Sequence, residues 1–99
     1  MSVPAHPIEH EASQSHGRYT IRLDGGPLAE MTYRRLAPDL IAIDHTLVPP
    51  EYRGQGVAQQ LVERAVADAR RDGFKIVPIC SYAVAQFRRH PEWEDLLGR

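Results

Sequence analysis

Residues 40–79 read LIAIDHTLVPPEYRGQGVAQQLVERAVADARRDGFKIVPI, and this stretch decides the fold. It opens with an apolar run from Leu40 to Ile43, which is typical of a strand covered on both faces in the middle of a sheet. Pro49 and Pro50 end the strand, because neither can donate to a ladder of hydrogen bonds. A helical pattern and a second apolar strand follow. The stretch therefore predicts a strand–helix–strand unit whose two strands are parallel.

The helix of this unit has the clearest pattern in the chain. Small and aliphatic side chains recur at helical spacing and form one stripe, which consists of Val57, Ala58, Leu61, Val62, Ala65, Val66 and Ala69. The opposite side is predicted to carry Gln59, Gln60, Glu63, Arg64 and Asp68. Gly73 is suited to end the helix in the left-handed conformation. Residues 74–79 then form the second strand of the unit.

Upstream of this unit, the sequence alternates as half-buried strands do. In residues 17–23 (GRYTIRL) the apolar residues Tyr19, Ile21 and Leu23 alternate with polar ones. The Asp-Gly-Gly-Pro that follows is predicted to form a turn. A second extended stretch covers residues 28–36. One face of that stretch carries Ala29, Met31 and Tyr33. The two stretches predict an antiparallel hairpin ahead of the strand that starts at Leu40.

The chain is expected to hold one domain. Residues 1–15 follow neither period, so they predict a flexible tail, and residues 16–99 then form the single domain. Residues 81–90 have helical spacing, which Pro91 breaks. The predicted fold is a mixed α/β (α+β) sheet of about four strands, with an antiparallel hairpin, a parallel crossover and a C-terminal helix.

Composition narrows the classes of function. Twelve Lys and Arg stand against 13 Asp and Glu, so the formal net charge is −1 and no broad basic surface favours nucleic acid or an anionic membrane. We see no spanning segment and no secretory signal. The single cysteine, Cys80, excludes a disulfide within the chain and a multi-cysteine zinc site. We expect a cytoplasmic monomer or weak dimer without metal, in which His6, His10 and His16 are solvated.

The loop between the strand and the helix carries the chemistry. Gly54 and Gly56 stand immediately before the helix, where free backbone amides and the positive end of the helix dipole attract phosphate. Two common nucleotide motifs do not fit. Val57 stands where the P-loop has lysine, and Gln59 stands where the dinucleotide fingerprint has a third small residue. A diphosphate ligand fits the loop, and an ordinary left-handed turn into a helix is the alternative.

Residues 53–58 (RGQGVA) match the Q/R-x-x-G-x-G/A signature of the GNAT superfamily of N-acetyltransferases, whose loop binds the pyrophosphate of acetyl-CoA. In that family the signature follows a strand and opens a helix, as it is predicted to do here. The stretch from His45 to Leu97 also resembles the small single-domain GNAT-like proteins. The resemblance covers residues 17–97 and implies a GNAT-like fold. It does not include the first strand and two helices that build much of the acceptor site in full-length GNAT enzymes.

The resemblance implies acetyl-CoA as cosubstrate and an amine of unknown identity as acceptor. The residues that it implies for acetyl-CoA binding are Leu47, Val48, Arg53, Gly54, Gln55, Gly56, Val57 and Ala58. Leu47 and Val48 would meet the pantetheine arm through their backbone, and Arg53 either contacts phosphate or lies in solvent. Candidates for the 3′-phosphate are the arginine pairs at residues 34–35, 70–71 and 88–89, which are otherwise surface residues.

Three residues are candidates for the chemistry, and each has a structural alternative. Cys80 ends the last strand, where the resemblance places the thioester, and it is an acetyl carrier, an acid toward the CoA thiolate or a small hydrophobic side chain. His45 is a base for the attacking amine or a hydrogen-bonded histidine of the sheet. In a regular strand Asp44 alternates to the face opposite His45, so the two are not paired. Tyr82 is an acid for the thiolate or a packing group.

Two functions of different classes follow from these residues. The first is an acetyl-CoA-dependent N-acetyltransferase, in which an amine attacks the thioester carbonyl to give an amide and free CoA. The second is a CoA-binding or protein-interaction module with little or no turnover, which the missing acceptor half of the site favours. A titrating group near the thioester distinguishes the two, because only the enzyme requires it.

Overall fold

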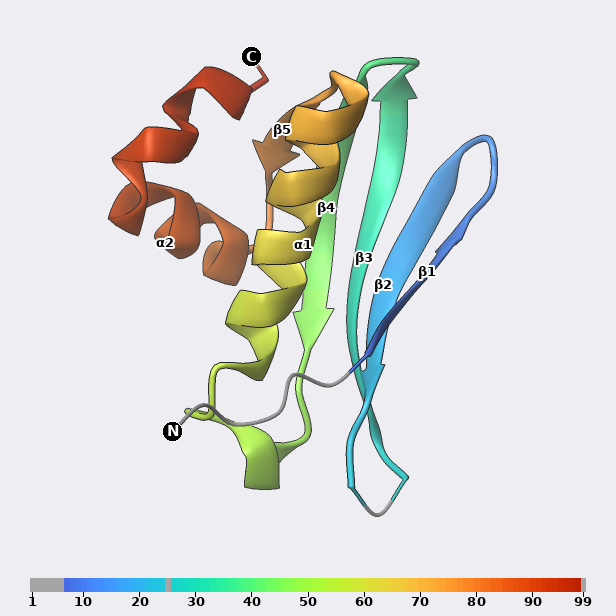
Figure 1. Ribbon diagram of the computed structural model, residues 1–99, viewed down its shortest axis with the longest axis vertical. Helices are drawn as coiled ribbons and strands as arrows, with labels where there is room; N and C mark the ends of the chain where they lie inside the picture. The colour runs from blue at the N-terminus through green and yellow to red at the C-terminus, as the bar shows by residue number, and fades with distance from the viewer. Residues whose placement is uncertain (1–6, 25, 99) are drawn as a thin grey trace.

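The computed structural model describes residues 7–24 and 26–98, which form one five-stranded sheet with helices packed against it (Figure 1). The strands are β1 (Ile8–Ala12), β2 (His16–Arg22), β3 (Leu28–Ala37), β4 (Leu40–Leu47) and β5 (Lys75–Pro78). The helices are α1 (Val57–Asp72) and α2 (Ser81–Arg89), with 3-10 turns η1 (Pro50–Tyr52) and η2 (Pro91–Leu96). The strands lie in chain order, and only β4 and β5 are parallel. The predicted hairpin and the predicted parallel pair are confirmed.

The flexible tail predicted for residues 1–15 is wrong where β1 forms. Residues 1–6 lie outside the described part of the chain, but Ile8–Ala12 pairs with β2 along its whole length. Ile8 packs against the core, and its carbonyl accepts a hydrogen bond from Nη1 of Arg64 at 3.4 Å. Because β1 contains a single large aliphatic residue, alternation cannot reveal it, and pairing with distant residues holds it instead. The sheet thus has one strand more than the predicted four or so.

β4 lies fourth in the sheet, whereas the sequence predicted it at the middle, a place that β3 occupies. Its apolar run is covered as expected, because Ile41, Ala42 and Ile43 are buried. Its pairing with β5 stops at Ile43, while its pairing with β3 continues as far as Leu47. Among the described strands, the second half of β4 therefore has no partner on its β5 side.

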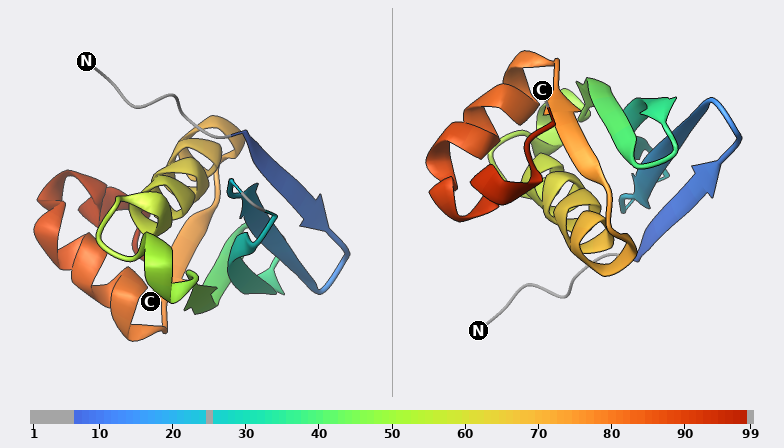
Figure 2. Two further views of the ribbon diagram at one scale, coloured as in Figure 1. Left: turned by 90° about the horizontal axis from the view of Figure 1, so that it is seen from below. Right: turned by 90° about the horizontal axis from the view of Figure 1, so that it is seen from above.

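α1 packs across β2 and β3, and α2 and η2 pack beside β5 and against α1 (Figures 1 and 2). The predicted apolar stripe of α1 is confirmed, with buried Val57, Leu61, Val62, Ala65, Val66 and Ala69. Gly73 ends the helix with a φ of 81°, in the left-handed conformation that the sequence predicted. Within the described residues no helix combines the length and the apolar character needed to cross a membrane.

Asp68 is buried inside the fold, with 2% of its surface exposed, so its predicted place on the polar side of the helix is wrong. It follows buried Leu61 by seven residues and Ala65 by three, a spacing that puts it on the buried face. Its carboxylate accepts hydrogen bonds from Tyr19 at 2.8 Å and Arg64 at 3.1 Å. A second guanidinium, that of Arg71, lies 3.3 Å away. These partners offset the cost of burying the charge.

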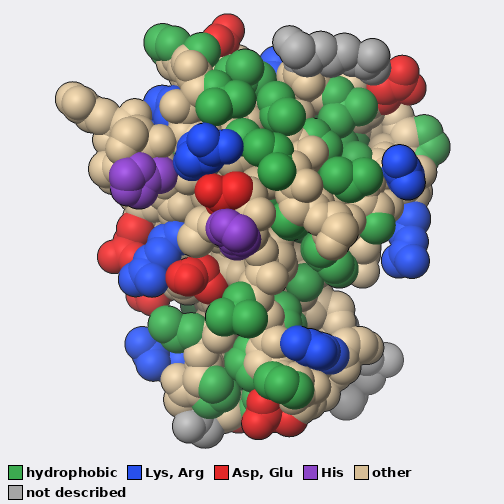
Figure 3. Space-filling view, turned by 180° about the vertical axis from the view of Figure 1, so that it is seen from behind, with side chains coloured by type: hydrophobic (Ala, Val, Ile, Leu, Met, Phe, Trp, Pro, Cys, Tyr) green, Lys and Arg blue, Asp and Glu red, His purple; other side chains and the backbone are tan. Residues whose placement is uncertain are grey.

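The face of the sheet away from α1 is polar over β2 and β3. Arg18 forms ion pairs with Glu11 at 2.6 Å and Glu30 at 3.4 Å, and Thr32 donates a hydrogen bond of 2.6 Å to Asp44. A view from behind shows charged side chains there, next to apolar patches (Figure 3). A cavity of about 600 Å³ lies on this face, but its charged residues are largely paired with one another.

Candidate active site

A pocket of about 490 Å³ opens where β4 ends and α1 begins. Figure 1 shows these two ends in the lower half of the molecule. Its walls are the end of β4, the loop after η1, the first turn of α1 and one side of α2. The lining residues are Thr46, Leu47, Val48, Tyr52, Arg53, Gly54, Gly56, Val57, Ala58, Gln59, Tyr82, Gln86 and Arg89. None of these described lining residues carries a carboxylate. All the predicted cofactor residues except Gln55 thus meet in one place.

The two glycines of the loop are required by backbone conformation. Gly54 has a φ of 82° and Gly56 a φ of 78°, values that cost an ordinary L-residue about 1–2 kcal/mol. A Cβ at either position would meet no protein atom within 4 Å, so the protein itself leaves open space there. Gly56 is also the N-cap of α1 and has no side chain to cap it. The first amides of α1 therefore stay available to an anion in the pocket.

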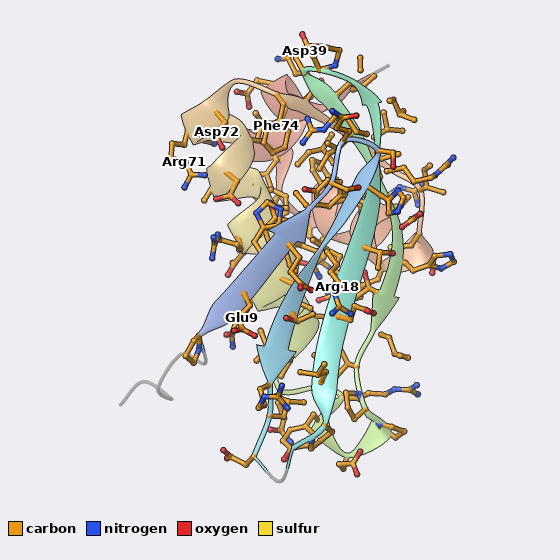
Figure 4. The ribbon with its side chains drawn as sticks, turned by 90° about the vertical axis from the view of Figure 1, so that its right-hand side faces the viewer. Glu9, Arg18, Asp39, Arg71, Asp72 and Phe74 are labelled. Atoms are coloured by element: carbon orange, nitrogen blue, oxygen red, sulfur yellow. The ribbon has the colours of Figure 1, made fainter. Side chains whose placement is uncertain are left out.

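Two arginines supply positive charge to the pocket. Arg53 and Arg89 both line it, and within the described chain neither side chain forms an ion pair or a hydrogen bond with protein. The other predicted arginine pairs lie elsewhere, since Arg34 lies 3.6 Å from Asp44 and Arg70 pairs with Asp95 at 2.9 Å. Arg71 pairs with acidic neighbours in the last turns of α1, where Figure 4 shows it next to Asp72. Among the arginines that the structure describes, Arg53 and Arg89 are thus the two placed to meet a phosphate here.

Gln55 is the one predicted cofactor residue outside the pocket. Its Nε2 donates a hydrogen bond of 3.2 Å to the carbonyl of Glu51, so its side chain closes the loop on itself. Tyr52 anchors the same loop from the other side, because its hydroxyl donates to the carbonyl of Asp24 at 2.6 Å. One bond thus holds the loop together, and the other ties it to the turn that follows β2.

Cys80 is the N-cap residue of α2 and lies next to a residue that lines the pocket. Its Sγ caps the helix by accepting a hydrogen bond from the amide of Ala83 at 3.4 Å, and it lies 3.5 Å from Oγ1 of Thr46. Thr46 itself lines the pocket, whereas Cys80 is not among the described residues that line it. The thiol is thus held close to the C-terminal end of β4.

Tyr82 faces the pocket one residue into α2. Burial raises the pKa of its phenol above the ordinary value of 10.0, and the charge of Arg89 opposes the rise more weakly. The phenol therefore keeps its proton at neutral pH and is available as a donor. This is the protonation state that an acid for a departing thiolate requires.

His45 is exposed and lies outside the pocket. It pairs with Thr32 in a part of the strand where the register shifts and Asp44 has no residue opposite. The predicted alternation of Asp44 and His45 assumed a regular strand, and the bulge removes that regularity, because Thr32 pairs with His45 and its hydroxyl also donates to Asp44. No hydrogen bond joins Asp44 to His45 in the described chain.

The histidines of the predicted tail differ from one another. His6 lies outside the described residues, and His16 is exposed beside Ser15. His10 is not simply solvated as predicted, because its ring stacks on Tyr19 and its Nε2 lies 2.7 Å from the hydroxyl of Tyr33. Across the described chain, no group of three or more His, Cys, Asp or Glu is placed to hold a metal ion.

Sequence reasoning missed four residues that line the pocket, which are Thr46, Tyr52, Gln59 and Gln86, and it named Arg89 without singling it out. Arg89 was considered only as one member of an arginine pair, and Gln86 only as part of the helical spacing of α2. Their spacing from Tyr82 offered a signal, because positions 82, 86 and 89 share one face of a helix. What that face meets is decided by how α2 packs.

The fold is a mixed sheet in which the pairing of the parallel strands β4 and β5 ends before β4 does. A glycine loop and an uncapped helix N-terminus lie at that end of β4, and this arrangement is that of the GNAT fold. The sequence profile of the GCN5-related N-acetyltransferases matches residues 18–96, so the chain belongs to that family. The resemblance inferred from RGQGVA is thereby confirmed.

Individual proteins agree with this assignment. Over 86 residues the chain is 28% identical to Protein NATD1 of Gallus gallus and of Homo sapiens, covering 86% of this chain and 78% and 76% of theirs. A GCN5-like candidate N-acetyltransferase of Staphylococcus aureus, solved in solution, is 33% identical with a TM-score of 0.69 and coverage of 91% and 87%. The ribosomal-protein-alanine N-acetyltransferase of Brucella melitensis shares the fold, with a TM-score of 0.61, 18% identity and coverage of 87% and 65%.

Proposed function

We propose that the protein binds acetyl-CoA in the pocket at the end of β4 and transfers the acetyl group to an amine. The observation that carries the proposal is the meeting of the free amides of α1 with the unpaired guanidinium groups of Arg53 and Arg89. An anion as highly charged as the diphosphate of CoA is stabilised by such a combination. Membership of the family supports acetyl transfer as the class of reaction.

The end of β4 is suited to hold the arm of the cosubstrate. Beyond Ile43, β4 no longer pairs with β5 but still pairs with β3. The edge of β4 that faced β5 therefore offers unpaired backbone donors and acceptors on the side of the pocket. An extended chain that contains amides can bind such an edge as an added strand would. Leu47 and Val48 are the predicted contacts, and both line the pocket.

The proposed reaction is a direct transfer. The amine nitrogen attacks the acetyl carbonyl carbon, the C–N bond forms, the C–S bond breaks, and the electron pair leaves on the sulfur of CoA. Tyr82 supplies the proton that the sulfur takes up, since its phenol lines the pocket and is protonated. The amine gives up its proton to solvent or to the exposed His45.

A CoA-binding module with little or no turnover is the second candidate. One observation favours it: among the described residues that line the pocket, no His, Asp or Glu is present to accept the proton of the amine. An assay distinguishes the two candidates: acetyl-CoA is incubated with the protein and a panel of amines, and chromatography measures the CoA that is released. Amine-dependent release supports the enzyme, whereas binding without release supports the module.

Calorimetric titration with acetyl-CoA tests binding, and two glycines provide a matched pair of variants. Gly56 and Gly73 have φ values of 78° and 81°, and a Cβ on either meets no protein atom within 4 Å. Gly56→Ala and Gly73→Ala should therefore lower the free energy of unfolding by similar amounts, about 1–2 kcal/mol. Only Gly56→Ala should weaken binding, because only Gly56 lies in the loop. Equal affinity in the two variants, or no binding by the wild type, would contradict the proposal.

A further inference from the structure

Gln86 is a buried polar residue without a partner. It is 4% exposed, and its side chain forms no hydrogen bond with the rest of the described chain. No fully buried side-chain nitrogen or oxygen among the described residues lacks a partner, so the amide group of Gln86 must reach open space. Among the described cavities, the pocket at the end of β4 is the one that Gln86 lines. The group therefore points toward whatever the pocket binds.

The surroundings of Gln86 leave its carboxamide few possible partners other than what occupies the pocket. The pocket lining includes aliphatic side chains, which are Val48 just after β4 and Val57 and Ala58 from α1. A carboxamide offers both an N–H donor and a carbonyl acceptor, and a buried amide that leaves them unused loses free energy. A ligand group with one donor and one acceptor of its own would satisfy it, and an amide is such a group.

The position of Gln86 along α2 further limits which ligands fit the pocket. Tyr82, Gln86 and Arg89 lie on one face of the helix and span about 10 Å. Tyr82 adjoins Cys80 and the end of β4, whereas Arg89 is a phosphate candidate. The face thus presents, in order, a proton donor, an amide and a cation.

We propose that Gln86 is the residue by which this pocket selects a ligand that carries an amide between its phosphate groups and its reactive end. In acyl-CoA that amide belongs to the pantetheine arm, so the inference rests on the proposed function. Gln86 binds the arm and leaves recognition of the nucleotide to the loop of α1 and the arginines. Its loss should accordingly affect ligands with an arm and spare those without one.

The test compares CoA with adenosine 3′,5′-bisphosphate, which lacks the arm. Gln86→Met keeps the length of the side chain and removes its donor and acceptor. Gln60→Met is the control, because Gln60 is a half-buried glutamine of α1 that does not line the pocket. Gln86→Met should weaken the affinity for CoA by about tenfold and change the affinity for the bisphosphate by less than about twofold. Gln60→Met should change neither.

A second measurement does not depend on how the variant folds. In the wild type, the side-chain NH₂ signals of Gln86 in ¹⁵N-resolved NMR should shift on addition of CoA and stay in place with the bisphosphate. Unchanged CoA affinity in Gln86→Met, an equal loss for both ligands, or equal shifts with both would overturn the role of Gln86 alone. Failure of the wild type to bind either ligand would overturn the proposed function as well.

Discussion

The hydroxyl of Tyr19 donates a hydrogen bond of 2.8 Å to Oδ2 of Asp68, and both side chains are buried. The bond joins β2 to the C-terminal half of α1 across 49 positions of sequence. Arg64 reinforces it, because its guanidinium pairs with the same carboxylate and lies 5.8 Å from the centre of the Tyr19 ring. The contact fixes α1 along the sheet, and therefore fixes where the free amides at its other end meet β4.

Removal of the Tyr19 hydroxyl should destabilise the protein. In Tyr19→Phe the buried carboxylate of Asp68 loses a partner that water cannot readily replace, so the free energy of unfolding should fall by about 1–3 kcal/mol. In the control, Tyr52→Phe, the lost bond is an exposed one to a carbonyl, and the loss should stay below about 0.5 kcal/mol. Urea unfolding followed by the fluorescence of Trp93, the single tryptophan, measures both. Equal losses of unfolding free energy in the two variants would contradict the argument that burial makes the Tyr19–Asp68 bond important for stability.

Acid should weaken the attachment of β1 through His10. Burial of its ring against Tyr19 and Tyr33 lowers the pKa of His10 below the ordinary 6.5, with nearby guanidinium groups acting in the same direction and Asp68 opposing them. The folded protein therefore binds this proton less readily than the unfolded chain. The contribution to stability is complete above about pH 6.5 and is lost as the pH falls through the lower folded value.

Unfolding at about pH 7.5 and about pH 5 measures this effect. His10→Phe keeps the stacking on Tyr19 and cannot titrate, so its stability should fall less between the two pH values than that of the wild type. His16→Phe alters an exposed histidine of the neighbouring strand and should keep the wild-type difference. The same pH dependence in all three proteins would show that His10 is not the responsible group.

Adjacent arginines of α2 should differ in their effect on acetyl-CoA. Arg89 lines the pocket, whereas Arg88 lines a separate cavity with Pro78 and Glu94. Arg89→Ala should weaken binding by about tenfold at low salt, because a charge-assisted bond to phosphate is lost, and Arg88→Ala by less than about twofold. The difference should shrink at high salt. Calorimetry at two salt concentrations tests this, and equal losses would indicate a general effect of charge.

Tyr82→Phe should reduce turnover without reducing affinity for acetyl-CoA. If its phenol protonates the departing sulfur, kcat with an accepted amine should fall by about a hundredfold. Because burial raises the pKa of Tyr82 above 10.0, its deprotonation should not limit the wild-type rate below that pH. Cys80→Ala is the comparison. Loss of turnover in Cys80→Ala together with normal turnover in Tyr82→Phe would assign the chemistry to the thiol instead.

Much of the fold could be predicted because its cues are local. The stripe of α1, the left-handed ends of the helix at Gly56 and Gly73, and the prolines after β4 act through backbone conformation and the periodicity of neighbouring residues. The loop RGQGVA carries its signal in the same way, because a helix N-terminus attracts phosphate wherever the chain places it. The predicted cofactor residues were therefore found together, with the exception of Gln55.

Where prediction failed, the deciding contacts were distant in sequence. β1 forms by pairing with β2 and by contacts to Tyr19, Tyr33 and Arg64, none of which its own composition reveals. Asp68 is buried because Tyr19 approaches from another strand to share its charge.

The sequence by itself determined β2 to β5, the helices α1 and α2, their order and the left-handed glycines of the loop before α1, since these depend on the conformational preferences of adjoining residues. Only the tertiary structure decided that Gln86 and Arg89 of α2 face that loop, while His45 remains outside it. The physical reason is that packing of α2 beside β5 selects which side of each element meets the pocket, and this choice is made by contacts between segments far apart in the chain.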